Sequence, residues 1–153
     1  MKKRMILVLA LLVLTAITFA ACTERVPSAP ASPDATQSTV FAQMQENRID
    51  YVGDTSEVGR LLAFLPSFDE NYTQNMFSLQ TQDEPYGITI YYEPSEKWNG
   101  NSMIVTEEMA VFSEYLFESI GNLGYVEFAY RRSNSDGYLD KSEYQILLRI
   151  YRE

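Results

Sequence analysis

Apolar and polar residues alternate around a turn in the middle of the chain. From Ile88 to Tyr92, apolar side chains recur at every second position, which is the period of a strand with one buried face. Pro85 and Gly87 indicate a turn just before, because proline fixes φ and glycine permits the positive φ that tight turns require. Residues 79–92 therefore predict a β-hairpin. A hairpin alone is marginally stable, so other elements must cover its apolar face.

Residues 54–66 and 106–121 have the apolar period of α-helices. Asp54 and Thr106 occupy N-cap positions, where a side-chain oxygen can accept the free N–H groups of the first turn. Glu57 is placed to complete a capping box with Asp54. The predicted buried stripes are Val58, Leu61, Leu62 and Leu65 in the first helix, and Val105, Met109, Phe112, Leu116 and Ile120 in the second.

Two more segments with apolar periodicity lie in the C-terminal third of the chain. Residues 125–131 alternate as a strand. Residues 143–151 fit a strand and a helix equally well, since their apolar side chains alternate but Asp140 could cap a helix, and periodicity leaves both open. The order of elements predicts one α+β domain over residues 40–153. We expect a small antiparallel sheet of about four strands with two helices packed on it.

The first 21 residues differ in composition from everything that follows. Lys2, Lys3 and Arg4 precede an apolar run that ends in small residues at Ala21. A positive start, a short apolar core and small residues before a cleavage point are typical of a secretory signal. The sequence therefore predicts a signal peptide over residues 1–21. An ordinary cleaved signal and an uncleaved anchor are the alternatives.

Cys22 is the only cysteine and directly follows the small residues. This arrangement resembles a bacterial lipoprotein signal, in which the cysteine is thioether-linked to diacylglycerol and carries fatty acyl chains such as palmitate. Phe19 stands where such signals usually have leucine. The prediction is lipid attachment at Cys22 and a position on the extracytoplasmic face of the cell membrane. Residues 22–39 are rich in proline, serine and alanine and predict an unstructured tether.

The chain is acidic. Without the three basic residues of the signal, nine of the 12 Lys and Arg residues remain against 21 Asp and Glu. Nucleic acid and anionic lipid surfaces repel such a protein, so neither is an expected partner. Plain solubility and an acidic face for a basic partner both remain open.

Most catalytic chemistries lack their residues in this sequence. There is no histidine, so His-based triads and the usual zinc sites are excluded. Carboxylate pairs at residues 69–70, 83–84 and 107–108 could serve a cell-wall hydrolase only if two acids converged in a cleft. Trp98 is the only tryptophan, and it could stack on a sugar ring or cover the core.

Residues 132–143 resemble the twelve-residue loop of a calcium-binding EF-hand. The oxygen ligands would come from Asn134, Asp136, Asp140 and Glu143, with a glycine at the sixth place. Arg132 occupies the first place, where the family has an acidic ligand, and a guanidinium there repels a cation. The alternative is a polar hairpin loop built from ordinary turn residues. The calcium hypothesis predicts a helical C-terminus and metal-dependent stability.

Two blocks of residues have a distinctive spacing. Residues 51–59 read Tyr-Val-Gly-Asp-Thr-Ser-Glu-Val-Gly, and residues 79–88 read Leu-Gln-Thr-Gln-Asp-Glu-Pro-Tyr-Gly-Ile. They resemble the signature blocks of a bacterial family catalogued as domain of unknown function 4825. Residues 110–122 resemble that family's next block, so the resemblance covers about residues 47–151.

The resemblance carries several implications. Domains of this family are extracytoplasmic, often belong to lipoproteins of Firmicutes, and are sometimes appended to membrane metallopeptidases that cleave antirepressors. This implies sensing or protein interaction by analogy, with no established catalytic residues. The family also tends to end in an alternating segment like residues 144–149, which favours a strand there and a hairpin loop at residues 133–142.

The sequence as a whole predicts a membrane-anchored lipoprotein that displays a non-enzymatic binding or sensing domain. The expected partners are the membrane, through the lipid on Cys22, and an envelope protein. No catalytic residue, cofactor or metal is assigned. The alternatives are a calcium-dependent module built on the loop at residues 132–143 and, as a more distant one, a cell-wall hydrolase.

Overall fold

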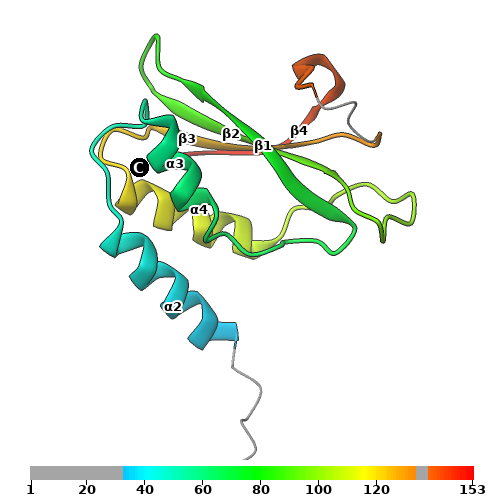
Figure 1. The fold of residues 1–153 in the computed structure, drawn as a ribbon, viewed down its shortest axis with the longest axis horizontal. Coiled ribbons are helices and arrows are strands. Elements are labelled where there is room, and N and C mark those ends of the chain that lie inside the picture. The colour runs from blue at the N-terminus through cyan, green and yellow to red at the C-terminus, as the bar shows by residue number, and fades with distance from the viewer. Residues whose placement is uncertain (1–32, 134–137) are drawn as a thin grey trace, which may run out of the picture. The chain divides into compact units, whose positions relative to one another are not determined.

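The computed structural model describes residues 33–133 and 138–153. The predicted signal peptide, Cys22, the predicted tether up to residue 32 and the candidate calcium ligands Asn134 and Asp136 lie outside these residues. The described elements are α2 (Pro33–Glu46), α3 (Thr55–Leu62), β1 (Tyr72–Gln80), β2 (Gly87–Pro94), α4 (Glu107–Ser119), β3 (Tyr125–Tyr130), the short 3-10 helix η1 (Lys141–Glu143) and β4 (Gln145–Tyr151) (Figure 1).

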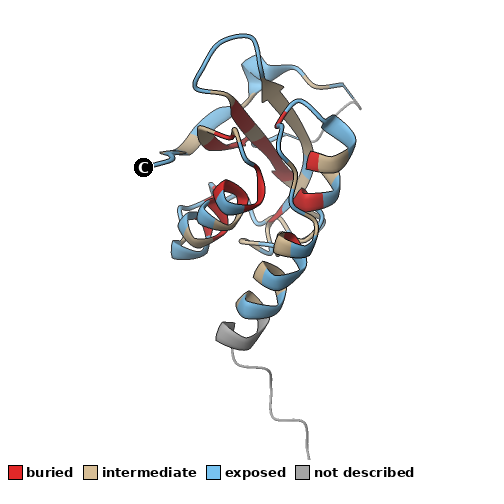
Figure 2. Ribbon diagram, turned by 90° about the vertical axis from the view of Figure 1, so that its left-hand side faces the viewer, coloured by how far each residue is buried: buried red, intermediate tan, exposed pale blue. Residues whose placement is uncertain are grey.

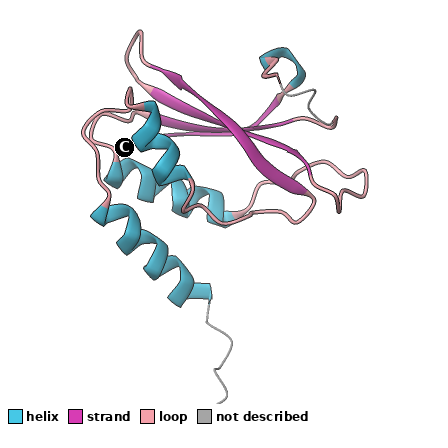
Figure 3. Cartoon of the chain, viewed as in Figure 1, coloured by secondary structure: helices cyan, strands magenta, loops and turns pink. Residues whose placement is uncertain are grey.

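The four strands form one sheet in the order β1-β2-β3-β4. β1 pairs with β2 and β3 pairs with β4 in antiparallel fashion, whereas β2 pairs with β3 in parallel. The predicted α+β class and four-stranded sheet are confirmed, but the sheet is mixed and not purely antiparallel. The reason is the connection, because α4 carries the chain back to the starting edge between β2 and β3 (Figure 3). A helical crossover of this kind joins parallel strands.

One face of the sheet and the helices enclose the core (Figure 2). The alternate residues Ile88, Ile90 and Tyr92 of β2 are buried, as the period of two predicts. Helix α3 contributes three buried side chains and α4 several more, and all of them join the strands in one cluster. The predicted stripes are confirmed except at two places. Leu65 is half-buried after α3 has ended, and Val105 is exposed because it precedes the first turn of α4.

The N-terminal ends of α3 and α4 differ. Asp54 caps α3 as predicted, since its carboxylate accepts the Glu57 N–H at 3.1 Å. The reciprocal half of the capping box is absent, because Glu57 pairs with Arg60 and the Asp54 N–H donates to the carbonyl of Tyr51. Thr106 occupies the N-cap position of α4, but its hydroxyl makes no capping hydrogen bond. Two acidic residues in the first turn still favour that end of the helix.

Helix α2 begins earlier than the composition predicted. Residues 33–39 are helical, so the prediction of an unstructured tether over residues 22–39 is wrong in that part. Pro33 is tolerated because the first helical position needs no N–H donor, and no proline follows it until α2 has ended. The helix packs on the domain through buried Met44 and through Phe41, whose ring centroid lies 4.6 Å from that of Tyr115.

The predicted hairpin over residues 79–92 is confirmed, and its first strand is longer than expected, since it begins at Tyr72. Gly87 has a different role from the predicted one. It lies inside β2 without a positive φ. A Cβ there would lie 2.1–2.4 Å from ring atoms of Tyr125, so glycine is required because the tyrosine ring occupies the space above it.

The structure decides two questions that the sequence left open, namely the form of the C-terminal segment and the role of Trp98. Residues 145–151 form strand β4, so the helical C-terminus that the calcium hypothesis predicted is wrong. The loop before β4 is therefore flanked by two strands rather than by the two helices of an EF-hand. The ring of Trp98 packs against the core cluster, and its Nε1 donates to the Asn101 carbonyl at 2.9 Å. Trp98 therefore covers the core.

Candidate functional site

The face of the sheet opposite the helices, which we call the outer face, carries side chains from all four strands. The strand register aligns Ser78, Thr89, Glu127 and Arg149 in one row across the sheet. Aromatic residues flank this row, with Tyr125 on one side and Tyr91 on the other. The outer face thus has small and polar side chains in its middle and large rings around them.

A chain of hydrogen bonds runs along the central row. The Thr89 hydroxyl donates to Glu127 Oε1 at 3.2 Å, and Arg149 Nε donates to Glu127 Oε2 at 2.6 Å. Glu127 is only 6% exposed, so its charge needs a partner, and Arg149 supplies it. The hydrogen bonds to Tyr151 and Glu127 raise the pKa of Arg149. The row therefore presents a fixed ion pair rather than a free carboxylate.

Tyr125 forms one end of the central region. Its ring lies over Gly87, its register partner on β2, where no side chain intervenes. The guanidinium of Arg149 lies 5.3 Å from the ring centroid, and the ring of Tyr151 lies 5.8 Å away. Burial and the charge of Glu127 raise the pKa of Tyr125. These contacts fix a neutral aromatic ring on the surface of the sheet.

Two tyrosines in edge-to-face contact form the other end. The rings of Tyr91 and Tyr144 meet edge to face with centroids 4.7 Å apart. The Tyr91 hydroxyl and Ser78 Oγ are 3.0 Å apart and share a hydrogen bond. Ala129 lies beside Tyr91 on β3 and has only a methyl group to fill the space. Bulky residues at both ends and small residues between them leave a depression.

This depression is a groove of about 520 Å³, which we call the sheet groove. Its volume is in the range of small-molecule binding pockets, about 300–1,000 Å³. Most of its side chains are polar or aromatic. They are Ser78, Leu79, Gln80, Thr81, Gln82, Thr89, Tyr91, Tyr125, Glu127, Ala129, Lys141, Tyr144 and Ile146.

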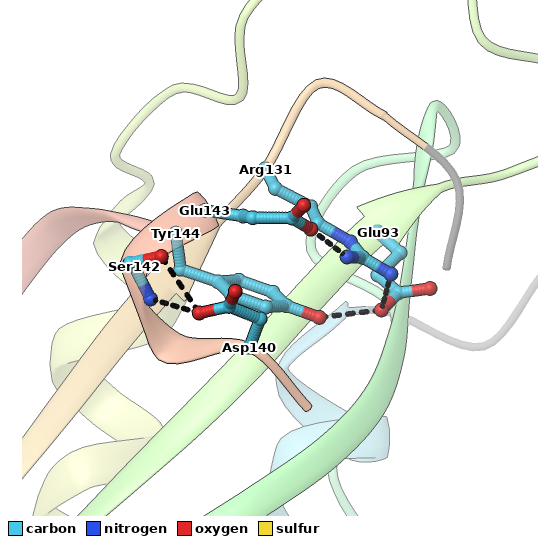
Figure 4. Close-up of polar contacts among 6 residues, drawn as sticks. All are labelled: Glu93, Arg131, Asp140, Ser142, Glu143 and Tyr144. Carbon is cyan, nitrogen blue, oxygen red and sulfur yellow. Dashed lines mark hydrogen bonds and ion pairs between the residues drawn. The ribbon is translucent and has the colours of Figure 1, made fainter. Parts of the chain in front are cut away.

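The described part of the loop before β4, residues 138–144, closes one end of the sheet groove. Arg131 anchors this loop to the sheet. Arg131 is 2% exposed. Its Nη2 donates to Glu93 at 2.7 Å and its Nη1 donates to Glu143, while the Tyr144 hydroxyl also donates to Glu93 (Figure 4). The guanidinium lies 5.1 Å from the Tyr144 ring centroid. Charge-assisted bonds of this kind are strong and directional, so they fix the position of Tyr144.

The surroundings shift two pKa values in this cluster. Burial raises the pKa of Tyr144 above its ordinary value of 10.0, and the hydrogen bond to Glu93 raises it further. Burial alone would lower the pKa of Arg131, but the hydrogen bond to Glu143 and the nearby negative charges raise it. Tyr144 therefore stays neutral and Arg131 stays charged over the physiological pH range.

The structure places two of the candidate calcium ligands, and neither points to a cation site. Asp140 accepts hydrogen bonds from the Ser142 N–H at 2.9 Å and from its hydroxyl at 2.7 Å. These bonds lower the pKa of Asp140. Glu143 is paired with Arg131. Among residues 33–133 and 138–153, no three acidic or other metal-ligating side chains gather into a group.

The other residues singled out from the sequence lie apart from the sheet groove. The carboxylate pair at residues 83–84 is exposed in the β1–β2 turn, and the pair at residues 107–108 is exposed in the first turn of α4. Asp69 accepts the Asn71 N–H at 2.8 Å in a local turn. In the described part of the chain, no helix is long and apolar enough to cross a membrane.

Sequence reasoning missed the residues that build the sheet groove. Glu127 stands between Val126 and Phe128, and a charged residue between two buried apolar ones was the available signal. Such a residue on a predicted strand lies on the face opposite the core. The pairing with Arg149 could not be read, because it depends on the strand register.

Comparisons with known proteins agree with the resemblance seen in the two blocks. No curated protein and no solved structure matches this chain. Residues 44–146 match the family described as domain of unknown function DUF4825. The match includes α3, the hairpin, α4, β3 and the start of β4, and thus nearly all the elements that build the core and the sheet groove. The chain therefore belongs to the DUF4825 family.

Proposed function

We propose that this protein is a lipid-anchored, extracytoplasmic binding protein whose ligand occupies the sheet groove. The observation that carries the proposal is the construction of the outer face. Rings of Tyr125 and Tyr144 are fixed in place around small and polar side chains. A preformed concave surface with a few oriented polar groups is typical of binding sites.

The proposed activity is binding without catalysis. Among the residues that the structure describes, Glu127 is the only carboxylate that lines the sheet groove, and it is held by Thr89 and Arg149. A general acid or base must come within hydrogen-bond reach of its substrate, and both oxygens of this carboxylate already accept hydrogen bonds within the sheet. The carboxylate therefore orients its neighbours.

The membrane anchor is proposed from the sequence alone. The basic start, the apolar run and the position of Cys22 support a lipidated N-terminus, which places the domain on the extracytoplasmic face. An envelope protein or an envelope component is then the accessible partner. Acidic charge on the domain disfavours nucleic acid and anionic lipid surfaces as ligands.

The anchor is tested by fractionation of cells that express the full chain or its Cys22→Ser variant. The wild-type protein should sediment with membranes and incorporate an alkyne analogue of palmitate. The variant should do neither. Membrane retention and labelling of Cys22→Ser would contradict the anchor.

The binding surface is tested separately by site-specific photo-crosslinking in intact cells. A photoreactive residue at Thr81, on the rim of the sheet groove, should give discrete adducts. The same residue at Tyr51, which is 70% exposed and lies outside the groove, is the matched control. Equal adducts from both positions, or none from Thr81, would contradict the proposed surface.

A further inference from the structure

We infer that the ligand of the sheet groove is a sugar chain, an inference that rests on the proposed function. The first step is what the outer face offers to a ligand. Backbone groups of β2 and β3 are paired on both sides within the sheet. A peptide cannot add to these strands as a further strand, so recognition on this face depends on side chains alone.

The second step concerns charge. Among the described lining residues, Glu127 pairs with Arg149 at 2.6 Å, and Lys141 adds one positive charge. A cationic ligand finds the carboxylate already occupied. The charge of Lys141 repels a cation as well. The groove therefore disfavours a cationic ligand.

The third step concerns the aromatic rings. Gly87 has no side chain, so the ring of Tyr125 lies across the strand as a flat platform, and Tyr144 stands at the other end of the groove. The face of an aromatic ring carries partial negative charge and attracts partially positive C–H groups. One face of a sugar ring presents a set of such C–H groups.

The fourth step concerns hydrogen bonding. Hydroxyl and amide side chains of Ser78, Thr81 and Gln82 line one wall of the groove. A hydroxyl can donate one hydrogen bond and accept two, and an amide carries both donors and acceptors. Ser78 retains acceptor capacity beside Tyr91, and the side chains of Thr81 and Gln82 are exposed. Groups that both donate and accept match the hydroxyls at the edge of a sugar ring.

The combination is more selective than its parts. A lipid would need an apolar channel, and a cationic ligand would need an unpaired carboxylate. A flat ring platform with a wall of uncharged donors and acceptors suits a polyhydroxylated ring with an apolar face. We therefore expect recognition of glycan chains built from hexoses or N-acetylated amino sugars.

The experiment is calorimetric titration of residues 22–153 carrying Cys22→Ser with chitotetraose, an uncharged β-1,4-linked chain of N-acetylglucosamine. This fragment retains the whole compact unit of residues 32–153. Saturable heat is expected at millimolar sugar. Tyr125→Leu, which keeps an apolar cover over Gly87 but removes the aromatic face, should weaken binding up to about tenfold. Tyr125→Phe should bind like the wild type.

Two further variants keep the test independent of folding. Thr81→Val changes an exposed side chain of the groove wall and should weaken binding, while Tyr51→Leu, outside the groove, should not. No heat with the wild type, equal affinity after Tyr125→Leu, or tighter binding of an uncharged alanine–serine tetrapeptide would overturn the sugar inference. Crosslinking from Thr81 would still report on the groove as a binding surface, so the two failures are distinguishable.

Discussion

The two faces of the sheet are built from the same four strands, but they bury side chains of opposite character. The helix-facing side buries apolar residues such as Ile90 and Phe128, which need no partner beyond close packing. The outer face buries Glu127, Glu93 and Arg131, whose charges must be paired because burial without a partner is costly.

This difference in buried side chains indicates which face of the sheet carries the function. Apolar packing alone accounts for the helix-facing side. The outer face could have been stabilised more simply by apolar residues, since replacing a buried ion pair with well-packed apolar side chains is often neutral or stabilising. The outer face instead has paired charges, a glycine that leaves room for a tyrosine ring, and a loop fixed by hydrogen bonds. These features are best explained by the shape that they give to the binding surface.

The largest effect should come from the helix-facing side. Phe128→Ala removes a fully buried ring and leaves a cavity, so the free energy of unfolding should fall by about 3–5 kcal/mol. Tyr125→Leu, on the same strand but facing outward, should lower it by less than about 1.5 kcal/mol. Urea denaturation followed by circular dichroism measures both. Equal losses of unfolding free energy in the two variants would contradict the proposed difference between the two faces.

The Arg131 cluster should come next. Glu93→Ala leaves the buried guanidinium with Glu143 alone, and breaking a buried pair in this way costs about 3 kcal/mol. Glu143→Gln is the matched control, because the Glu143 side chain is 49% exposed and such pairs contribute at most about 1 kcal/mol. If Glu143→Gln were the more destabilising change, Arg131 would depend more on the loop residue Glu143 than on Glu93 of β2.

Gly87→Ala tests the ring platform. The new Cβ would lie 2.1 Å from a ring atom of Tyr125, so the ring must move, at a cost of about 1–3 kcal/mol. Gly59→Ala is the control, since its Cβ would make ordinary contacts with Phe77 at 3.4 Å and alanine favours a helix by about 1 kcal/mol. Tyr125→Ala should suppress the cost of Gly87→Ala, and full additivity of the two changes would refute the platform.

Alkaline pH should lower the free energy of unfolding through the ionisation of Tyr144. Its folded-state pKa is raised above 10.0 by burial and by Glu93, so the stabilisation from the neutral phenol is complete below pH 10. It is lost as the pH rises, because the unfolded chain ionises first. Unfolding free energy measured from pH 8 to 11 should fall less steeply in Tyr144→Phe. A steeper fall in that variant would contradict the assignment.

Calcium should have the smallest effect. Glu143 is engaged with Arg131, Asp140 is engaged with Ser142, and the segment after the loop is a strand. Millimolar calcium should therefore leave the thermal midpoint of the wild type unchanged, and Glu143→Gln should respond no differently. A calcium-dependent rise that disappears in Glu143→Gln would restore the loop as a metal site.

Local patterns in the sequence predicted most of the helix-facing side. The period of two in β2 and the stripes in α3 and α4 identified the buried residues, because each periodicity records one buried face. The parallel pairing of β2 with β3 was missed, since it depends on the path of a crossover and not on any one segment.

The outer face was much less accessible to sequence reasoning. Glu127 and Arg149 are 22 positions apart, and only the register of β3 with β4 brings them together. Gly87 was interpreted as a turn residue because the ring above it belongs to Tyr125 on another strand. Contacts that link distant strands leave no periodic signal along the chain.

The most direct test of the central claim is nuclear magnetic resonance of residues 22–153 carrying Cys22→Ser during titration with chitotetraose. Amide shifts should concentrate at Ser78, Thr81, Thr89 and Tyr125, while amides of α3 and of the buried face of α4 should stay unchanged. Shifts centred on the helices, or no shifts at saturating sugar, would contradict the outer face as the binding surface for a glycan.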